Sequence, residues 1–309
     1  MKNKFKIGID YGGTKIEGIL LDQDGRQLER KRYSYERNYL SGIETVKKLV
    51  DEFDKISEEA CSVGIGIPGF SSRQTGIITN ANSLWLNDKP FKKDLELALN
   101  REVRLMNDAN CFTLSEAVDG AGKDYKSIFG IIIGTGFGGG LSYNKSIIEG
   151  SNQIAGDWGH QPLPYPTKEE QETKISCPSN NCGRPLCAEQ FMSGIGFKDR
   201  FNQKHDTNFT SEEIVKLDLE NDPRANLELG LYEDRMARLM AVMIGIFDPD
   251  AIILGGGMSN IDRFYKNIPS LIPKYTFSNK VETKVLKNLH GDSSGVRGAA
   301  WLWNNEKYN

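Results

Sequence analysis

The stretch FKIGIDYGGTK at residues 5–15 decides the fold of this chain. Its first half alternates apolar side chains with small or polar ones up to Asp10, the two-residue period of a β-strand. The glycine pair Gly12 and Gly13 follows, and such a pair lets the backbone turn sharply and approach a ligand closely. Because residues 16–21 resume the alternation, we expect a second strand, with a hairpin tip between the two.

The tip of this hairpin has two interpretations. Residues 8–15 read G-x-x-x-x-G-T-K, close to the P-loop pattern, but a P-loop opens a helix whose N-terminal amides surround the phosphates. A strand pattern follows here, so we reject the P-loop. We predict instead that Asp10 faces a magnesium ion and that Thr14 and the backbone amides face phosphate. An ordinary Gly-Gly hairpin turn without a ligand is the alternative.

The composition predicts a globular protein with room for two domains. The chain has 309 residues, of which 38% are hydrophobic and 26% charged, and its formal net charge is −3. Lys and Arg form no block, so we expect no nucleic-acid partner, and no apolar run reaches membrane-spanning length. We expect a cytoplasmic location, because the N-terminus lacks a signal-peptide pattern. Five cysteines in that reducing compartment argue against a disulfide framework.

A candidate catalytic carboxylate follows a predicted strand at residues 102–106. The sequence Asn-Asp-Ala-Asn at residues 107–110 comes next, and a helix is expected at 111–118. Asp108 therefore sits where a strand gives way to a helix, the usual ligand crevice of an α/β sheet. An ionised carboxylate there could accept a proton from a bound hydroxyl, which is worth about 10²–10⁴ in rate. The alternative is that Asp108 is only the helix N-cap.

A second glycine-rich segment resembles the first hairpin. Residues 128–133 predict an apolar strand, which runs into GTGFGGG at residues 134–140. This matches G-x-G-x-x-G, but the dinucleotide-binding fingerprint requires a helix next. Residues 141–148 read as a strand with its turn at Asn144-Lys145, so we predict a second hairpin for phosphate. Two such hairpins suggest a duplicated fold with nucleotide between the halves.

Three more glycines follow the strand predicted at residues 251–254. Gly255, Gly256 and Gly257 would permit flat approach of an adenine ring, or would make only a tight turn from strand to helix.

Other segments predict elements or loops by local signals. Gly120-Ala121-Gly122 indicates a hinge or a domain boundary. The asparagines at positions 80, 82 and 87 either serve the turns of their loop or face a carbohydrate. We expect helices at 187–201, with Glu189 in the first turn, at 223–247 and at 291–303, and a strand at 281–286.

A cluster of thiols predicts a metal site. His160 precedes Cys177, Cys182 and Cys187, and four residues separate each cysteine from the next. Three cysteines and one histidine form a closed, structural zinc site in many proteins. The alternative is three thiols with no shared role.

The ordered set of motifs resembles the ROK family of sugar kinases. The set comprises DYGGTK (10–15), NDAN (107–110), GTGFGGG (134–140), GDWGH (156–160), CGRPLCAE (182–189) and LGGG (254–257). The resemblance implies an α/β protein with the actin-like ATPase (ribonuclease H-like) fold, in which two α/β domains flank a cleft. The domains would be residues 1–119 and a larger domain at 120–292 with the zinc-binding loop. A helix at about 293–309 would pack back on the first domain.

The same resemblance implies the roles of the site residues. Asp108 would be the catalytic base. The residues binding the sugar would be Gly69, Asn82, Asn107, Asp108, Asp157, His160 and Glu189. ATP and magnesium would be held by Asp10, Gly12, Gly13, Thr14, Lys15, Gly134, Thr135, Gly136, Gly138, Gly255, Gly256 and Gly257. Structural zinc would be held by His160, Cys177, Cys182 and Cys187. The chain departs from the family twice: Asp157 replaces the usual Glu, and the first two cysteines usually have one residue between them.

The implied reaction is ATP-dependent phosphorylation of a free hexose. Residues 80–87 and 291–303 are most similar to bacterial fructokinases, so we expect D-fructose to give fructose 6-phosphate, with mannose and glucose as further substrates. The alternatives are an N-acetylglucosamine kinase or glucokinase, and a sugar-responsive regulatory protein without catalysis. The family also implies a homodimer.

Overall fold

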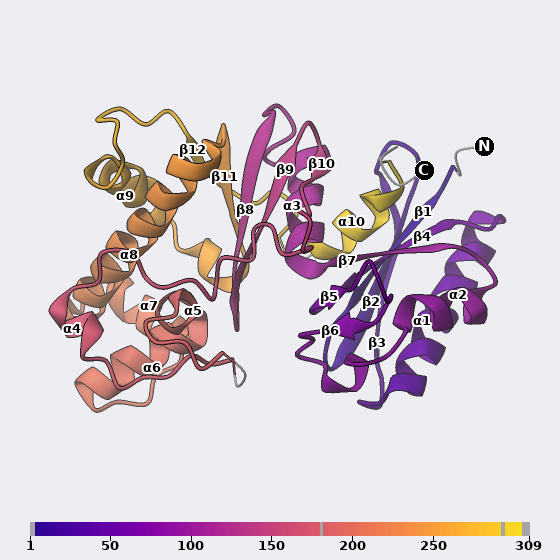
Figure 1. The fold of residues 1–309 in the computed structure, drawn as a ribbon, viewed down its shortest axis with the longest axis horizontal. Helices are drawn as coiled ribbons and strands as arrows, with labels where there is room; N and C mark the ends of the chain where they lie inside the picture. Colours follow the sequence, from indigo (N-terminus) through magenta and orange to yellow (C-terminus); the bar gives the residue numbers. More distant parts are fainter. Residues whose placement is uncertain (1–3, 180–181, 292–293, 305–309) are drawn as a thin grey trace. The chain divides into compact units, whose positions relative to one another are not determined.

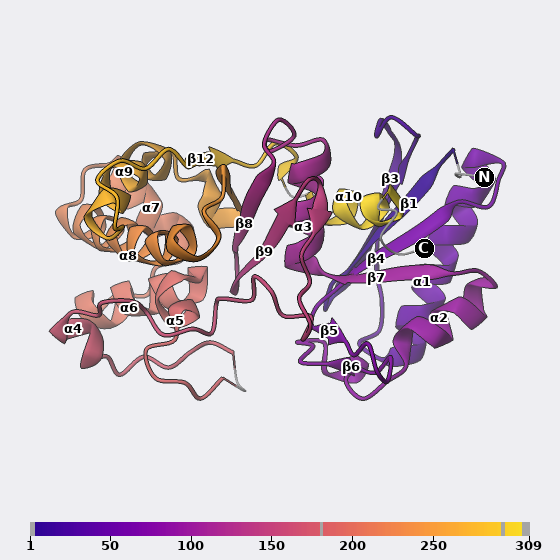
Figure 2. The same ribbon diagram turned by 45° about the horizontal axis from the view of Figure 1, so that its top comes forward.

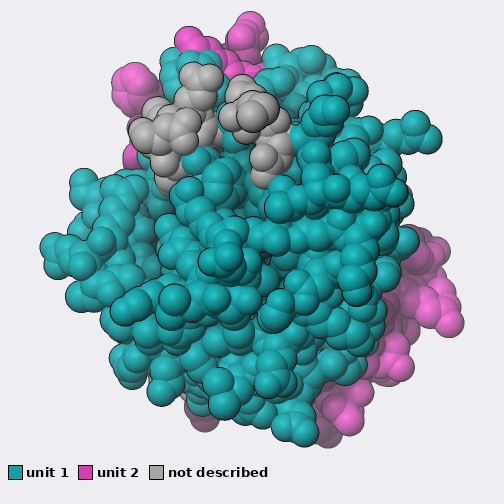
Figure 3. All heavy atoms as spheres, turned by 90° about the vertical axis from the view of Figure 1, so that its right-hand side faces the viewer, with its two compact units in different colours: residues 1–124, 141–155, 289–309 teal, residues 125–140, 156–288 magenta. Residues whose placement is uncertain are grey.

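The computed structural model describes residues 4–179, 182–291 and 294–304. The chain divides into two compact units, each built from separate stretches of sequence. Unit 1 contains residues 1–124, 141–155 and 289–309, and unit 2 contains residues 125–140 and 156–288. Figure 3 shows one face of unit 1 in teal. None of the helices described is both long and apolar enough to cross a membrane.

Unit 1 is built on a mixed sheet with strand order β3-β2-β1-β4-β7. Its strands are β1 (Lys6–Tyr11), β2 (Lys15–Leu21), β3 (Gln27–Ser34), β4 (Ser62–Ile67) and β7 (Val103–Asn107). The first three pair antiparallel, whereas β4 is parallel to both β1 and β7. The expected hairpin is confirmed, because β1 and β2 pair from Lys6↔Leu21 to Tyr11↔Ile16.

Strand β3 has no counterpart in the sequence prediction. Its side chains are largely polar and either exposed or only partly buried, so the period-2 apolar pattern is missing. Cross-strand charges stabilise the pairing instead: Glu17 of β2 accepts hydrogen bonds from both Arg30 and Arg32. A polar strand of this kind is suited to the edge of a sheet.

Helices cover both faces of this sheet (Figure 1). They are α1 (Tyr39–Ser57), α2 (Phe91–Leu99), α3 (Asp108–Val118) and α10 (Ser294–Trp301). Side chains of α1 and α2 pack with Ile7 and Ile9, while α3 and α10 pack with Ile19 and Leu21 on the other face. The strand alternation therefore supplies two cores, one on each face.

Glycines let α10 approach the sheet closely. A Cβ on Gly8 of β1 would overlap the carbonyl of Val296, and one on Gly64 of β4 would overlap that of Ala299. Of the final helix expected at residues 291–303, the structure describes α10 from Ser294 to Trp301, and residues 292–293 lie outside the described part of the chain. The short elements that complete unit 1 are β5 (Phe70–Ser71), β6 (Ile78–Thr79), β10 (Ser146–Ile147) and the 3₁₀ turns η1 (Leu84–Leu86) and η5 (Leu302–Asn304).

Unit 2 has its own sheet, in which β9, β8, β11 and β12 are successive neighbours. These strands are β8 (Ser127–Ile133), β9 (Phe137–Tyr143), β11 (Ala251–Gly255) and β12 (Lys284–Lys287). Its helices are α4 (Lys168–Gln171), α5 (Ala188–Met192), α6 (Gly194–His205), α7 (Ser211–Leu219), α8 (Pro223–Phe247) and α9 (Arg263–Leu271), with 3₁₀ turns η2 (Gly257–Asn260) and η3 (Ile272–Lys274). The long α8 begins at an Asp222 N-cap and contacts α5, α6, α7 and α9 (Figure 2).

Three boundaries in this part of the chain differ from the sequence prediction. The strand expected at 141–148 begins earlier, at Phe137, as β9. The glycines at its start carry no apolar pattern, and at Gly139 a Cβ would press on the Phe129 ring. The single helix expected at 187–201 is two helices, separated by extended backbone at Ser193, whose hydroxyl caps α6. The strand expected at 281–286 is β12, and it pairs with β11 only from Lys284 onward.

Candidate functional site

The strand-to-helix turn after β7 presents Asp108 to solvent. Asn107 is the N-cap of α3, and its side chain accepts a hydrogen bond from the amide of Ala109. The alternative role of Asp108 as N-cap is therefore wrong, although its Oδ1 also accepts from Ala109 at 2.8 Å. The Asn107 amide also donates to the Gly69 carbonyl at 3.3 Å. Gly69 has φ +88°, and a Cβ there would press on the backbone of residues 79–81.

Asp10, near the end of β1, has a strongly raised pKa. Burial and the charges of Asp108 and Glu17 together raise this pKa to about 7, and the charge of Arg32 opposes them. Asp10 lies opposite Glu17 in the β1/β2 register. Asp10 and Asp108 disfavour each other's charge, and such a pair of carboxylates is suited to a bound cation. Glu17 is already paired with Arg30 and Arg32. Glu17 was not among the predicted site residues, although cross-strand counting from the glycine pair would have found it.

The hairpin tip is open to a ligand. Gly13, Thr14 and Lys15 are exposed, and a Cβ on Gly13 would lie 3.5 Å from the Ser83 hydroxyl. In the neighbouring asparagine-rich loop, Asn82 is exposed. The Asn87 amide instead forms two hydrogen bonds with the backbone of Ala81, so it closes the loop and is not available to a sugar.

In unit 2, Glu189 forms a hydrogen bond with the backbone of the second glycine-rich turn. This buried carboxylate, in the first turn of α5, accepts a hydrogen bond from the Phe137 amide at 3.1 Å. It also accepts from the Ser179 hydroxyl and from the Cys177 thiol. Ser179 was not among the predicted site residues, since a lone serine in a loop gives no sequence signal. Gly134, Thr135, Gly136 and Gly138 lie at the turn and at the start of β9, and a Cβ on Gly134 would meet open space.

The segment around His160 pairs with the chain that leads into α5. The Gly159 carbonyl accepts from the Glu189 amide at 2.7 Å, and Pro162 forms a β-bridge with Cys187. Asp157 is half-buried, and burial raises its pKa, with Glu189 adding to the effect and His160 opposing it. Asp157, His160 and Glu189 are therefore held in one electrostatic neighbourhood of unit 2.

The four predicted zinc ligands do come together. The ligand atoms of His160, Cys177, Cys182 and Cys187 all lie within 4.8 Å of one another. The Cys177 and Cys187 sulfurs are 3.5 Å apart, close to the roughly 3.7 Å that tetrahedral Zn–S bonds of about 2.3 Å require. Burial raises the pKa of Cys187 to about 11 when no cation is present. This donor set fits a structural zinc ion.

The third glycine group follows β11. Gly256 has φ +80°, and a Cβ there would press on the Ile133 backbone, so this position is fixed by packing in the sheet. Gly257 has open space where a Cβ would be, which leaves it accessible to a flat ligand. Gly255 is the last residue of β11, and a 3₁₀ turn, not a regular helix, follows.

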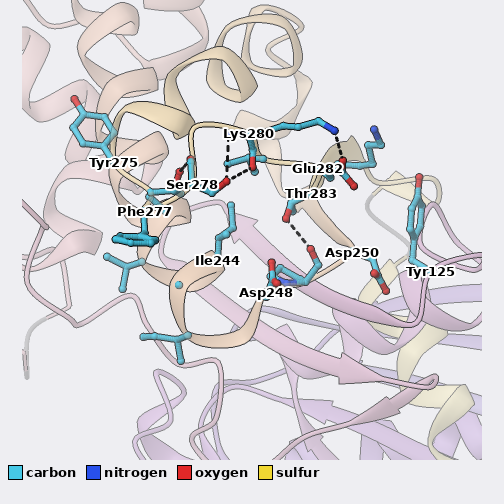
Figure 4. A pocket seen from close by; sticks show the side chains of 18 of the residues that line it. Tyr125, Ile244, Asp248, Asp250, Tyr275, Phe277, Ser278, Lys280, Glu282 and Thr283 are labelled. Carbon is cyan, nitrogen blue, oxygen red and sulfur yellow. Dashed lines mark hydrogen bonds and ion pairs between the residues drawn. The ribbon is translucent and has the colours of Figure 1, made fainter.

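A hollow of about 910 Å³ lies elsewhere in unit 2 (Figure 4). It is lined by the end of α8, the loop after η3 and the approach to β12, including Asp248, Phe277, Lys280 and Thr283. None of the predicted site residues lines it.

Comparison with known proteins places the chain in a family. A model of the ROK family matches residues 6–306. The chain belongs to the ROK family. An N-acetyl-D-glucosamine kinase of Vibrio cholerae is 36% identical over 296 residues, covering 96% of this chain and 98% of the relative. That of Haemophilus influenzae is 35% identical over 301 residues, covering 96% and 98%. Among solved structures, a ROK hexokinase from Thermus thermophilus matches with a TM-score of 0.82 at 23% identity, covering 96% of each chain.

Membership of the ROK family agrees with the predicted fold. Both units are α/β, and the chain has the actin-like ATPase fold of this family. The finer resemblance to fructokinases is not confirmed, because the relatives from Vibrio cholerae and Haemophilus influenzae are both named N-acetyl-D-glucosamine kinases.

Proposed function

We propose that the chain is an ATP-dependent N-acetylglucosamine kinase that phosphorylates the 6-hydroxyl of the free sugar. The observation that carries the proposal is the 36% identity, over almost the full length of both chains, with a kinase of that name. This identity favours N-acetylglucosamine, the alternative substrate given above, over fructose.

Asp108 would be the catalytic base. Its carboxylate is exposed at the N-terminus of α3, while Asn107 supplies the cap. As the sugar oxygen attacks the γ-phosphorus of ATP, that oxygen's proton would pass to Asp108. Catalysis of phosphoryl transfer depends mainly on positioning and charge stabilisation. The hydrogen bond from Asn107 to the Gly69 carbonyl would hold the backbone next to Asp108 in place.

The nucleotide would be held by the glycine-rich turns. Backbone amides and Thr14 at the first tip, and Gly134, Thr135, Gly136 and Gly138 in unit 2, would bind phosphate, while Gly255, Gly256 and Gly257 would face adenine. Asp10 would hold magnesium, which neutralises phosphate charge. Burial and the charges of Asp108 and Glu17 raise the pKa of Asp10, which supports a cation beside it.

The sugar hydroxyls would be bound by Asn82, Asn107, Asp157, His160 and Glu189. His160 and Glu189 are both tied to the thiol cluster, through Cys187 and Cys177 respectively. Zinc there would stiffen the donors and take no part in the chemistry, since four protein ligands close its coordination sphere.

A panel of sugars tests the proposal. ATP, magnesium and one of N-acetylglucosamine, glucose, mannose or fructose would be supplied, and kcat/KM measured for each. We expect the highest value for N-acetylglucosamine. A higher value for fructose would restore the fructokinase assignment, and no turnover with any sugar would favour a regulatory protein.

A further inference from the structure

An aromatic cluster in unit 1 joins the hairpin tip to the asparagine-rich loop. Tyr35, directly after β3, donates its hydroxyl to the Gly12 carbonyl at 2.9 Å. Its ring packs edge-on against Tyr11, with centroids 5.5 Å apart, and against Trp85 at 6.2 Å. The indole of Trp85, within η1 of the loop, donates to the Tyr11 hydroxyl at 3.3 Å. Both the tip and the loop therefore rest on the same three rings.

The bond to Gly12 fixes the direction of a phosphate-facing amide. In a planar trans peptide, the carbonyl of one residue and the N–H of the next point in opposite directions. By holding the Gly12 carbonyl, Tyr35 turns the Gly13 N–H to the opposite side. A Gly-Gly peptide has few steric restraints of its own, so it needs such an external anchor. Burial raises the pKa of Tyr35, which keeps its hydroxyl protonated as a donor.

The cluster itself is packed tightly enough to transmit a displacement. Tyr11 is fully buried, and a Cβ on Gly42 of α1 would overlap its hydroxyl, so the ring has no free space behind it. Trp85 also contacts this core, and Asn82 lies three residues before it on a loop closed by Asn87. Movement of the loop must therefore move Trp85 against Tyr11 and Tyr35.

We propose that Tyr35 is a positioning residue that orients the Gly12–Gly13 peptide for nucleotide phosphate and couples nucleotide binding to sugar binding at the Asn82 loop. This inference rests on the proposed function, in which the tip binds phosphate and the loop binds sugar. Coupling between two ligands is reciprocal, so each ligand tightens the binding of the other by the same factor.

Calorimetric titration of the full chain tests the proposal. The probes are N-acetylglucosamine, and a non-hydrolysable ATP analogue with magnesium, each titrated alone and in the presence of the other. The variants are Tyr35→Phe and Trp85→Phe. The control is Tyr39→Phe, which removes a hydroxyl from a ring that adjoins the cluster. Tyr39 packs on Phe91, which packs on Tyr11, and the Tyr39 hydroxyl donates to Asp94 at 2.7 Å and not to the tip.

We expect Tyr35→Phe to weaken binding of the analogue about 3- to 10-fold, the range of one net hydrogen bond. The factor by which one ligand tightens the other should fall towards one in both variants, with the affinity for sugar alone unchanged. The melting temperature of Tyr35→Phe should also be unchanged. In steady state, KM for ATP should rise more than kcat falls. Tyr39→Phe should match the wild type.

The outcomes separate this inference from the proposed function. Wild-type affinity and wild-type coupling in Tyr35→Phe would overturn the role of Tyr35 and leave the kinase assignment intact. Equal losses in Tyr35→Phe and Tyr39→Phe would also overturn it, because the effect would then be general to the cluster. A wild-type chain that binds the analogue but no hexose would overturn the proposed function and the coupling. In that case, unchanged affinity of Tyr35→Phe for the analogue would overturn the positioning role too.

Discussion

Asp108 and Asp10, two carboxylates of unit 1, are suited to different roles because their surroundings differ. Asp108 is exposed and begins a helix, whereas Asp10 lies near the end of a strand, and burial and the charges of Asp108 and Glu17 together raise its pKa to about 7. The first is suited to accept a proton from a substrate at neutral pH, and the second to share its charge with a cation.

The Asp108→Asn variant should lose kcat by at least about 10²-fold, the usual contribution of a general base. The substitution keeps the size of the side chain and leaves the Asn107 cap intact, so the fold and the affinity for sugar should change little. Steady-state kinetics, thermal unfolding and sugar titration are the measurements. Turnover close to that of the wild type would show that Asp108 is not the base.

Asp10 predicts a specific pH dependence of stability in metal-free protein. Its pKa rises on folding from 3.8 to about 7, so the folded state binds this proton more tightly than the unfolded state does. Its contribution to the free energy of unfolding is therefore full below about pH 4 and is lost as the pH rises through about 7.

Urea unfolding of the wild type and of Asp10→Asn at a series of pH values measures this effect. The stability of the wild type relative to the variant should fall between about pH 4 and pH 7 and then level off. Magnesium should raise the stability of the wild type more than that of the variant. A difference that is constant, or that grows with pH, would contradict the prediction.

At the level of elements, the sequence predicted correctly those helices and strands whose stabilising contacts lie close together in the chain. The β1/β2 hairpin was predictable because its alternation and its glycine pair lie within about twenty residues. Strand β3 was not, because charge pairing with Glu17 across the sheet stabilises it. The break at Ser193 was also missed, since a single serine cap within a helical pattern is a weak signal.

The candidate site shows the same division. Motif spacing identified the thiol cluster, and the structure brings its four ligand atoms together. Spacing did not reveal that Ser179 donates a hydrogen bond to Glu189, or that the Asn87 side chain forms hydrogen bonds with the Ala81 backbone. Such contacts depend on how loops close, which no periodic pattern records.

We expect the segment between His160 and Cys187, which includes α4, to need bound zinc for its ordered structure. We expect about one equivalent of zinc per chain in protein purified without chelator, and its loss in Cys187→Ser, because Cys187 is the buried member of the cluster. Cys61→Ser is the control, since Cys61 is a buried thiol outside the cluster. Metal analysis and sugar titration are the measurements.

Chelation should weaken sugar binding before it unfolds the chain, because the cluster holds His160 and Glu189 in place. Full kinase activity with only a small fraction of an equivalent of zinc would contradict this prediction.

At the level of the whole molecule, the chain passes between its two units at residues 124/125, 140/141, 155/156 and 288/289. The segments next to two of these crossings, 124/125 and 288/289, form hydrogen bonds with the side chain of a single residue, Glu116. Glu116 of α3 is fully buried and accepts hydrogen bonds from the amides of Ala121 and Leu289, at 2.9 and 3.0 Å. It also accepts from the Ser294 hydroxyl at 2.7 Å, just inside α10. The glycine-rich boundary expected at residues 120–122 is therefore anchored by α3.

The last prediction follows from this convergence of donors on Glu116. One carboxylate oxygen of Glu116 accepts from the amides of Ala121 and Leu289, and the other faces the His290 amide at 3.5 Å and the Ser294 hydroxyl. In Glu116→Gln, the side-chain NH₂ therefore faces at least one backbone N–H whichever way the amide is turned. Breaking part of a buried hydrogen-bond network usually costs about 2–4 kcal/mol, and we expect the free energy of unfolding to fall by that amount. Urea unfolding measures it, with Glu44→Gln, at an exposed position of α1, as the control. Ser294→Ala should cause a smaller loss, and it should be non-additive with Glu116→Gln because the two side chains share a bond. Equal stability of Glu116→Gln and Glu44→Gln would show that α3 does not anchor these segments.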